Sequence, residues 1–400
     1  MFKVFQRPIC LLYLLATATL LRLCIGLHSY SGAHTPPRYG DYEAQRHWME
    51  VTLNLPVKHW YANSTDNNLD YWGLDYPPLS AYQSWLYGKL LQPFEPRAFE
   101  LRRSRGYETP RSKLLLRWCV VASDLLVFFP AVLASVAVLT RGRAPACKSA
   151  LLAAALLQPA ALLIDHGHFQ YNNLCLGLAA GAAAAVAGGR HLLGSCLFCL
   201  ALNHKQMALY YAPAFFAHLL GCALRLPSLP AKVTRICELG ATVVATFAAC
   251  WAPFLVQPAR GADVLRRLAP LGRGLYEDYV ANFWCSTSAL VKWRQLFSQQ
   301  VLVHACAGCT LAALLPAAVA EARRPSAQGL LRCMAASSFA FFLFSYQVHE
   351  KSIMLPLLPL TLLGASGDAG EAMLRRWLPA MAAFSMFPLL KKDRLRRLCG

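Results

Sequence analysis

The chain alternates between long apolar runs and short polar connections, and this pattern predicts helices that cross a membrane. About 20 helical residues span the hydrocarbon core of a bilayer. The first apolar run covers residues 9–27 and is interrupted by Arg22. No small-residue cleavage site of the kind that ends a secretory signal follows this run. We therefore interpret residues 1–27 as an uncleaved first transmembrane helix.

Further apolar runs fill the remainder of the chain. They lie near residues 114–139, 149–164, 174–187, 192–202, 207–223, 236–256, 300–319, 330–346, 353–364 and 377–390. Several are too short to cross a bilayer straight, which predicts kinked or broken helices. The sequence therefore predicts an all-α, polytopic membrane protein with about nine to eleven transmembrane helices. Its multi-span core is expected to cover residues 114–390.

The orientation of the chain follows from the basic residues in its short loops, because such residues favour the cytoplasmic side. Basic clusters lie at 141–148, 225–235 and 323–324. Placing all three in the cytoplasm makes residues 28–113 a large first lumenal loop, which we expect to be the catalytic loop. The remaining lumenal loops are then expected near 165–173, 203–206, 258–298 and 347–352.

The composition supports a membrane protein and argues against a nucleic-acid-binding one. Hydrophobic residues make up 56% of the 400 residues, and charged residues only 15%. The net charge of +19 comes from basic residues between apolar runs and from a basic tail at 391–400, with no dedicated basic domain. Most of the 15 cysteines lie inside apolar runs, where a thiol behaves as a small hydrophobe. The loop 28–113 contains no cysteine, so no disulfide can staple it.

Two acidic motifs in the loop 28–113 are candidates for sugar chemistry. Asp41 and Glu43 are two positions apart, so on a helix they do not share one face. One of them could point at a substrate while the other is solvated; the alternative is a surface helix of mixed charge. Asp75 precedes Tyr76-Pro77-Pro78, whose prolines stiffen the backbone. That stiffness suits a residue that holds a sugar hydroxyl, but a simple turn explains it equally well.

Two histidine motifs lie in the predicted lumenal loops. His166 and His168 stand beside Asp165, but three ligands of this kind are too few to assign a metal, and a hydrogen-bonded loop is favoured. His349 and Lys351 can each donate hydrogen bonds to a phosphate. The alternative is that Lys351 snorkels toward the membrane surface with Glu350 as its partner. The sequence thus predicts no metal site.

One potential modification site lies in the same lumenal loop. Asn63-Ser64-Thr65 is an N-glycosylation sequon, which makes Asn63 a candidate glycosylation site.

Several of these motifs resemble those of a known family. The segments GDYEAQRHW, WGLDYPP, DHGHFQYNN, NHKQMALYYAP and VHEKSIMLPLLP occur in this order in the chain. Together they resemble the ALG glucosyltransferases of the endoplasmic reticulum, which belong to the glycosyltransferase C superfamily, and in particular those that add the first glucose. The resemblance covers the chain to about residue 390. Family members usually continue for roughly another hundred residues, so we expect the C-terminus to be truncated relative to the family.

The resemblance implies a function and a site. It implies transfer of the first glucose from dolichyl phosphate glucose, in alpha-1,3 linkage, onto a dolichol-diphosphate-linked oligosaccharide in the endoplasmic reticulum membrane, without a cofactor. Asp41 corresponds to the family's proposed general base in an inverting reaction. The remaining residues of the motifs are expected to bind substrate: Glu43, Arg46, His47, Trp72, Asp75, Tyr76, Arg105, His166, His168, Gln170, His204, Lys205, Gln347, His349 and Lys351.

Two other functions agree with a polytopic chain. A transporter or flippase of lipid-linked sugars predicts inverted repeats and polar residues near the bilayer midplane. The sequence shows no repeat, and its polar motifs lie at the lumenal ends of the runs. A truncated, non-catalytic relative of the family is the third hypothesis.

Overall fold

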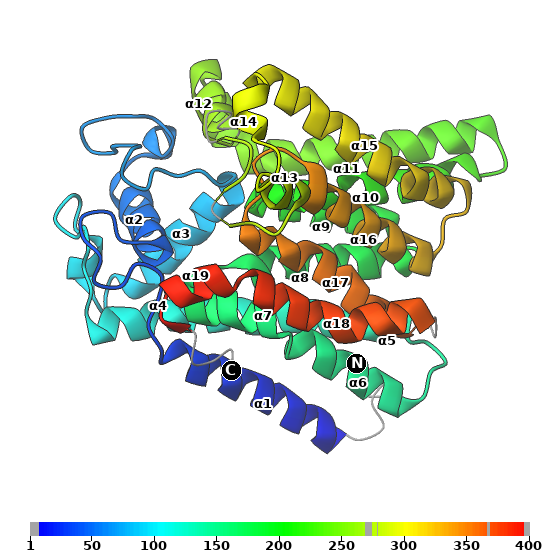
Figure 1. The fold of residues 1–400 in the computed structure, drawn as a ribbon, viewed down its shortest axis with the longest axis horizontal. Helices are drawn as coiled ribbons and strands as arrows, with labels where there is room; N and C mark the ends of the chain where they lie inside the picture. Colours follow the sequence, from blue (N-terminus) through cyan, green and yellow to red (C-terminus); the bar gives the residue numbers. More distant parts are fainter. Residues whose placement is uncertain (1–7, 269–273, 278, 366–368, 396–400) are drawn as a thin grey trace.

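The computed structural model describes residues 8–268, 274–277, 279–365 and 369–395. Within these ranges the chain is helical, with no β-strand and one isolated bridge between Tyr276 and Val348. The helices run roughly side by side, and the segment 28–113 lies at one end of the bundle (Figure 1). The all-α fold class is therefore confirmed.

The N-terminal half begins with a membrane helix and the two helices of the polar segment. The α-helices are α1 (Pro8–Gly26), α2 (Asp41–Asn54), α3 (Pro78–Leu91), α4 (Pro110–Ser123), α5 (Phe129–Leu139), α6 (Pro145–Leu156), α7 (Pro159–Ala161), α8 (Asn172–Ala187) and α9 (His191–His204). Two π-helical segments, η4 (Asp124–Phe128) and η5 (Leu162–Phe169), join α4 to α5 and extend α7. Short 3-10 turns, η2 (Val57–His59) and η3 (Pro96–Phe99), lie in the polar segment.

The C-terminal half contains two long helices and several short ones. Its α-helices are α10 (Ala212–Leu224), α11 (Leu229–Leu255), α12 (Pro258–Leu268), α13 (Phe283–Thr287), α14 (Trp293–Leu296), α15 (Gln299–Arg323), α16 (Ala327–Phe344), α17 (Met354–Leu362), α18 (Ala369–Ser385) and α19 (Phe387–Lys392). The 3-10 segments are η6 (Gln206–Tyr211), η8 (Glu350–Ile353) and η9 (Leu363–Ala365).

Fewer helices than expected are long enough to cross a membrane. Within the described ranges, seven helical stretches meet the length and apolar composition of a span, and α8 and α9 are shorter apolar helices. The sequence predicted about nine to eleven spans because it counted each apolar run as a crossing. Proline, glycine and polar residues cut several of these runs into the short helices that sequence analysis expected.

A buried ion pair explains the arginine that interrupts the first apolar run. Arg22 of α1 donates from Nε to Asp124 Oδ2 at 2.6 Å and from Nη1 to the carbonyl of Leu156 at 2.9 Å. Asp124 also accepts from Asn173 Nδ2 at 2.9 Å and lies 3.0 Å from His166 Nε2. Charged groups inside a membrane bundle are costly unless they are paired. This cluster therefore ties α1, η4, α6, η5 and α8 together.

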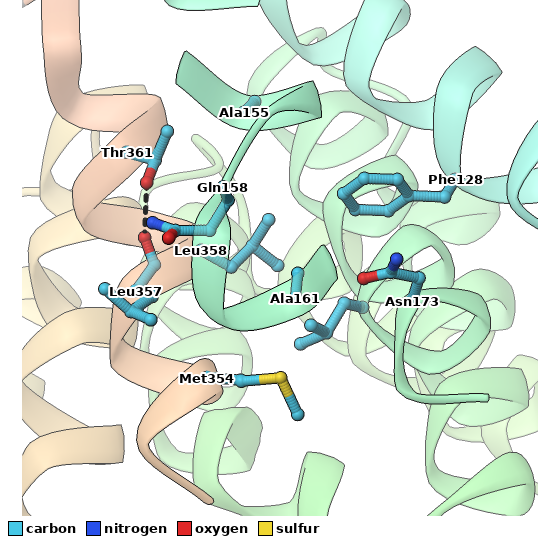
Figure 2. A pocket seen from close by; sticks show the side chains of 10 residues that line it. Phe128, Ala155, Gln158, Ala161, Asn173, Met354, Leu357, Leu358 and Thr361 are labelled. Atoms are coloured by element: carbon cyan, nitrogen blue, oxygen red, sulfur yellow. Dashed lines mark hydrogen bonds between the residues drawn. The ribbon is translucent and has the colours of Figure 1, made fainter. Parts of the chain in front are cut away.

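The largest apolar core lies between the membrane helices and encloses a small pocket. Gln158 and Asn173 are polar side chains in this pocket, while Phe128, Met354 and Leu358 are among its apolar ones (Figure 2). None of the residues that line the pocket belongs to the predicted site. The pocket is therefore a feature of the packing between helices rather than a candidate substrate site.

Candidate active site

A tight turn fixes the start of α2 against the membrane helices. The backbone N–H of Ser31 donates to the carbonyl of His168 at 3.0 Å, and the Ser31 hydroxyl accepts from the N–H of Asp41 at 3.2 Å. Gly32 has a φ of +73°, and a Cβ there would lie 1.9 Å from the nitrogen of Gly40. Only glycine fits so close an approach. The turn therefore holds Asp41, the first residue of α2, beside the segment that carries His168.

Three predicted loops meet at the carboxylate of Asp41. Its Oδ2 accepts from Lys351 Nζ at 2.6 Å and from Gln170 Nε2 at 2.5 Å, and it lies 2.7 Å from His168 Nε2. The Oδ1 atom accepts no hydrogen bond from any residue that the structure describes. The Asp41 side chain is 21% exposed, against 3% for His168 and 15% for Lys351. One carboxylate oxygen is thus anchored and the other is available to a ligand.

The charges around Asp41 keep it ionised. Burial by itself raises the pKa of this carboxyl, but the adjacent Lys351 and His168 outweigh burial and hold the pKa well below its ordinary value. His168 contacts Asp41 through Nε2 and Asp393 through Nδ1. An imidazole between two carboxylates can satisfy both only by donating from both nitrogens. The result is a row of alternating charges that runs Asp393, His168, Asp41, Lys351.

A second layer supports Gln170. Lys205 donates from Nζ to Gln170 Oε1 at 2.8 Å and to Asn172 Oδ1 at 2.7 Å, and its ammonium lies 4.6 Å from the ring centroid of Tyr76. Burial lowers the pKa of Lys205 to about 8. The amide of Gln170 is therefore held at its oxygen by Lys205 while its nitrogen donates to Asp41. Lys205 therefore positions Gln170, and it makes no hydrogen bond to Asp41 itself.

Other predicted residues form a separate, buried ion network in α2. Arg46 makes a two-pronged contact with Glu43, with both N–O distances 2.7 Å, and contacts Glu50 at 2.8 Å. His47 Nδ1 lies 3.1 Å from Glu50 Oε2. The sequence suggested that one of Asp41 and Glu43 points at a substrate while the other is solvated. Solvation of Glu43 was wrong, because Glu43 is buried against Arg46. These side chains rigidify α2 directly behind Asp41.

The other residues predicted to bind substrate lie in neighbouring contacts. Arg105 stacks on the ring of Tyr71 at 4.5 Å, and the Tyr71 hydroxyl donates to Glu43 at 2.8 Å. This connects Arg105 with the ion network of α2 rather than with Lys351. The indole of Trp72 donates to the carbonyl of Arg38.

A further group surrounds the turn before α3 and the turns after α9 and α16. The carbonyl of Asp75 accepts from Gln206 at 3.0 Å, and His204 Nε2 lies 2.6 Å from Gln83 Oε1. The backbone N–H of Gln347 donates to the carbonyl of Leu275 at 2.9 Å, and His349 Nε2 lies 3.9 Å from Glu277. The structure thus gathers Asp41, His168, Gln170 and Lys351 directly and leaves the others at the periphery. Their role in substrate binding remains a prediction.

One alternative and one expectation from the sequence are corrected. Lys351 contacts Asp41 rather than pairing with its neighbour Glu350. Residues 165–169, expected as a loop, form the last turn of η5, and Asp165 is buried there, accepting from Asn172 Nδ2 at 2.8 Å. Hydrogen bonds from the start of α8 to Asp165 hold this turn in place.

Sequence reasoning missed Asp393 and Arg117. Asp393 was seen only as part of a basic tail, of which residues 396–400 lie outside the described residues. The guanidinium of Arg117 donates to the carbonyls of His166, Gly167 and Ser29, the last two at 2.8 and 3.1 Å. An arginine near the start of an apolar run is the only sequence signal for this role. No local signal marks Asp393, because its partner lies 225 residues away.

A cavity adjoins this site on the side of the C-terminal helix. It measures about 390 Å³ and is lined by Tyr279, Glu350, Pro388, Leu389, Lys391 and Lys392. Its size is in the range of ligand pockets.

A separate groove of about 250 Å³ lies between α1 and α4, where Leu23, Leu114 and Trp118 line it together with Lys113 and Arg117. Among the described residues, the group of side chains that could hold a metal ion is His191, His218 and Cys222, and it includes none of the side chains around Asp41.

Comparison with known proteins shows the family of the chain. A model of the ALG6, ALG8 glycosyltransferase family matches residues 18–398. The chain is 50% identical over 381 residues to a protein of Arabidopsis thaliana named probable dolichyl pyrophosphate Man9GlcNAc2 alpha-1,3-glucosyltransferase, covering 94% of the chain and 70% of that protein.

Animal and yeast proteins show the same relationship. The Rattus norvegicus dolichyl pyrophosphate Man9GlcNAc2 alpha-1,3-glucosyltransferase is 45% identical over 375 residues, which cover 94% of the chain and 73% of that protein. The Saccharomyces cerevisiae protein of the same name is 43% identical over 385 residues, covering 94% and 70%. With the family motifs meeting at one carboxylate and the match extending over nearly its whole length, the chain belongs to the ALG6, ALG8 glycosyltransferase family.

Proposed function

We propose that this chain transfers glucose from dolichyl phosphate glucose, in alpha-1,3 linkage, onto a dolichyl-diphosphate-linked Man9GlcNAc2 oligosaccharide. The relatives' names give this acceptor and linkage for the relatives. The observation that carries the proposal is the convergence of Lys351, Gln170 and His168 on one oxygen of Asp41. A transporter or flippase gives no reason for a partly exposed carboxylate held in this way.

The reaction inverts the anomeric carbon. The acceptor 3-hydroxyl oxygen attacks C1 of the β-linked glucose, and its proton passes to Asp41. The bond between C1 and the phosphate oxygen breaks, and dolichyl phosphate leaves with the electron pair. A positioned base of this kind contributes about 10²–10⁴-fold to the rate. Oδ1 is the proton acceptor, because Oδ2 is already committed to three partners.

Lys351 links the base to the leaving group. Its ammonium donates to Asp41, which keeps the carboxylate ionised but makes it a weak base. A donor phosphate near Lys351 attracts the same ammonium. Moving this charge from Asp41 to the phosphate raises the basicity of Asp41 and stabilises the leaving group in one step. Transfer would then proceed only after the donor has bound.

The basic side chains near Lys351 suit a lipid phosphate. Lys391 and Lys392 line the cavity next to Glu350, and the backbone N–H of Lys351 donates to His349 Nδ1 at 3.3 Å. Dolichyl phosphate glucose carries less charge than a nucleotide diphosphate sugar, so cationic side chains suffice and we propose transfer without a metal. The groove between α1 and α4 supports lateral entry of a lipid chain.

The proposed location is the endoplasmic reticulum membrane with the site in the lumen. Asn63 is exposed and belongs to the same segment, 28–113, as Asp41. An N-linked glycan on Asn63, removed by endoglycosidase and absent from Asn63→Gln, would support a lumenal site. Protease accessibility of residues 28–113 from the cytosolic side of sealed microsomes would contradict it.

The decisive experiment measures glucosyl transfer by the purified chain in lipid nanodiscs. Radiolabelled dolichyl phosphate glucose and a dolichyl-diphosphate-linked acceptor are supplied, and the product is treated with an alpha-glucosidase. Asp41→Asn keeps the shape of the side chain and is expected to lower the rate by about 10²–10⁴-fold. Asp70→Asn, an exposed acid in the same polar segment, is the matched control and should retain the rate. Full transfer by Asp41→Asn would refute the assignment of the base, and no transfer by the unmodified chain would favour a non-catalytic relative.

A further inference from the structure

A second cluster of chemically active side chains lies away from Asp41. His191, His218 and Cys222 each offer one ligand atom, and these atoms lie within 4.8 Å of one another. The two imidazole rings are 6.3 Å apart between centroids and nearly perpendicular, at 86°. His218 is buried, and the other two are partly buried. The proposed glucosyl transfer uses none of these three residues.

Three helices bring the cluster together. His218 and Cys222 stand four positions apart on α10, so they share one face of that helix. His191 is the first residue of α9 and reaches the same point from a different helix. A Cβ on Gly221 would lie 2.4 Å from the carbonyl oxygen of Ala322, so α10 and α15 approach closely here. The cluster is therefore built by helix packing rather than by a surface loop.

A carboxylate from α15 orients the buried imidazole. Glu321 Oε1 lies 2.6 Å from His218 Nδ1, and the same oxygen accepts from the backbone N–H of Ser326 at 3.0 Å. Both Glu321 and His218 are buried. With Nδ1 donating to a fixed carboxylate, Nε2 of His218 becomes the free ligand atom. A histidine held by a carboxylate through its second nitrogen is the usual arrangement behind a metal ion.

We propose that His191, His218 and Cys222 bind a single divalent cation of the zinc class, with Glu321 orienting His218. Two imidazole nitrogens and one thiolate are the mixed ligand set that zinc takes in proteins. Bond lengths of about 2.0–2.3 Å in a tetrahedron place ligand atoms about 3.3–3.8 Å apart. The ligand atoms need to close by roughly 1 Å, which side-chain rotation supplies. The fourth position is left for water or another small ligand.

The site is remote from the proposed chemistry. Helix α9 has 14 residues, beginning at His191 and ending at His204, next to Lys205. At 1.5 Å per residue this helix is about 20 Å long, so His191 lies about 20 Å from the residue that precedes Lys205. The cation would join α9 to α10, with α15 behind them, at the end of α9 that lies away from Lys205. Its role is to fix the packing of these helices rather than to take part in transfer.

The test measures metal content and coordination directly. The full chain is purified, stripped with a chelator, and titrated with Zn²⁺ alone, and bound zinc is counted by mass spectrometry. We expect one zinc per chain, and with Co²⁺ in its place an absorption band from a cobalt–thiolate bond. Cys222→Ser and His191→Ala should each abolish this binding. Glu321→Gln should weaken it by about 10–100-fold without removing it.

The control and the contrary outcomes separate this site from the proposed function. Cys309→Ser removes an exposed cysteine of α15 and should bind zinc as the unmodified chain does. Less than one zinc per unmodified chain, a cobalt complex without a thiolate band, or zinc retained by both Cys222→Ser and His191→Ala would overturn the proposal. Loss of glucosyl transfer affects none of these readouts, so the two proposals fail independently.

Discussion

The ion network behind Asp41 predicts a large and specific loss of stability when its arginine is removed. Arg46 is fully buried and binds Glu43, Glu50, the carbonyl of Ala98 and the hydroxyl of Ser104, at distances of 2.6–2.8 Å. Arg46→Met keeps an apolar stem of similar length but leaves two buried carboxylates without their main cation. Breaking a buried ion pair from one side costs about 3–5 kcal/mol.

The pKa of Glu50 gives a second measure of the same effect. Burial alone would raise this pKa, but a hydrogen bond from His47 and the charge of Arg46 hold it at about 2, against an ordinary value of 4.5. That difference corresponds to roughly 3 kcal/mol, which agrees with the cost of breaking a buried pair. Because the pKa in the folded state is depressed, this stabilisation is complete above about pH 4.5 and is lost as the pH falls toward 2.

Hydrogen–deuterium exchange of the α2 amides at pH 7 measures the loss where it occurs. A loss of about 3 kcal/mol speeds local exchange by roughly 100-fold. Arg102→Met is the matched control, since Arg102 and its partner Asp66 form an exposed ion pair that contributes about 1 kcal/mol or less. Adding Glu43→Gln and Glu50→Gln to Arg46→Met should restore much of the protection, because no unpaired charge then remains buried. The reasoning is refuted if the α2 amides of the triple variant exchange as fast as those of Arg46→Met. It is also refuted if the α2 amides of Arg102→Met exchange as fast as those of Arg46→Met.

Three further predictions concern the groups around Asp41. Lys351→Ala should raise the KM for the donor more than the KM for the acceptor glycan in steady-state kinetics; an equal rise in both would remove Lys351 from the donor site. The transfer rate should fall as the pH rises through about 8, where Lys205 loses its charge. Lys205→Gln should have a lower rate that does not fall over this pH range; the same fall in the variant would exclude Lys205. Asp393→Asn weakens one charge-assisted hydrogen bond to His168 and should lower kcat by about tenfold, with KM unchanged, since such bonds contribute about 1.5–3 kcal/mol; a normal kcat would leave Asp393 without a positioning role.

The sequence alone determined the class of the molecule and the segments that build its site. Apolar runs depend only on neighbouring residues, so they predicted the membrane helices, and the resemblance of the loop motifs to a known family implied Asp41, His168, Gln170 and Lys351 as candidates. Glu43, Arg46 and Glu50 are three and four positions apart, so on a helix they share one face. Their complete burial was not visible, since it depends on what covers that face.

The tertiary structure decided which of these groups pair with one another. Lys351 and Asp41 are 310 residues apart, and His168 and Asp393 are 225 apart. Arg22 pairs with Asp124, which lies 102 residues away in the sequence. Such pairs follow from the rotation and axial offset of packed helices, and no local pattern encodes these quantities. For the same reason the number of full spans could not be read from apolar runs alone, because packing decides which short helices join into a crossing.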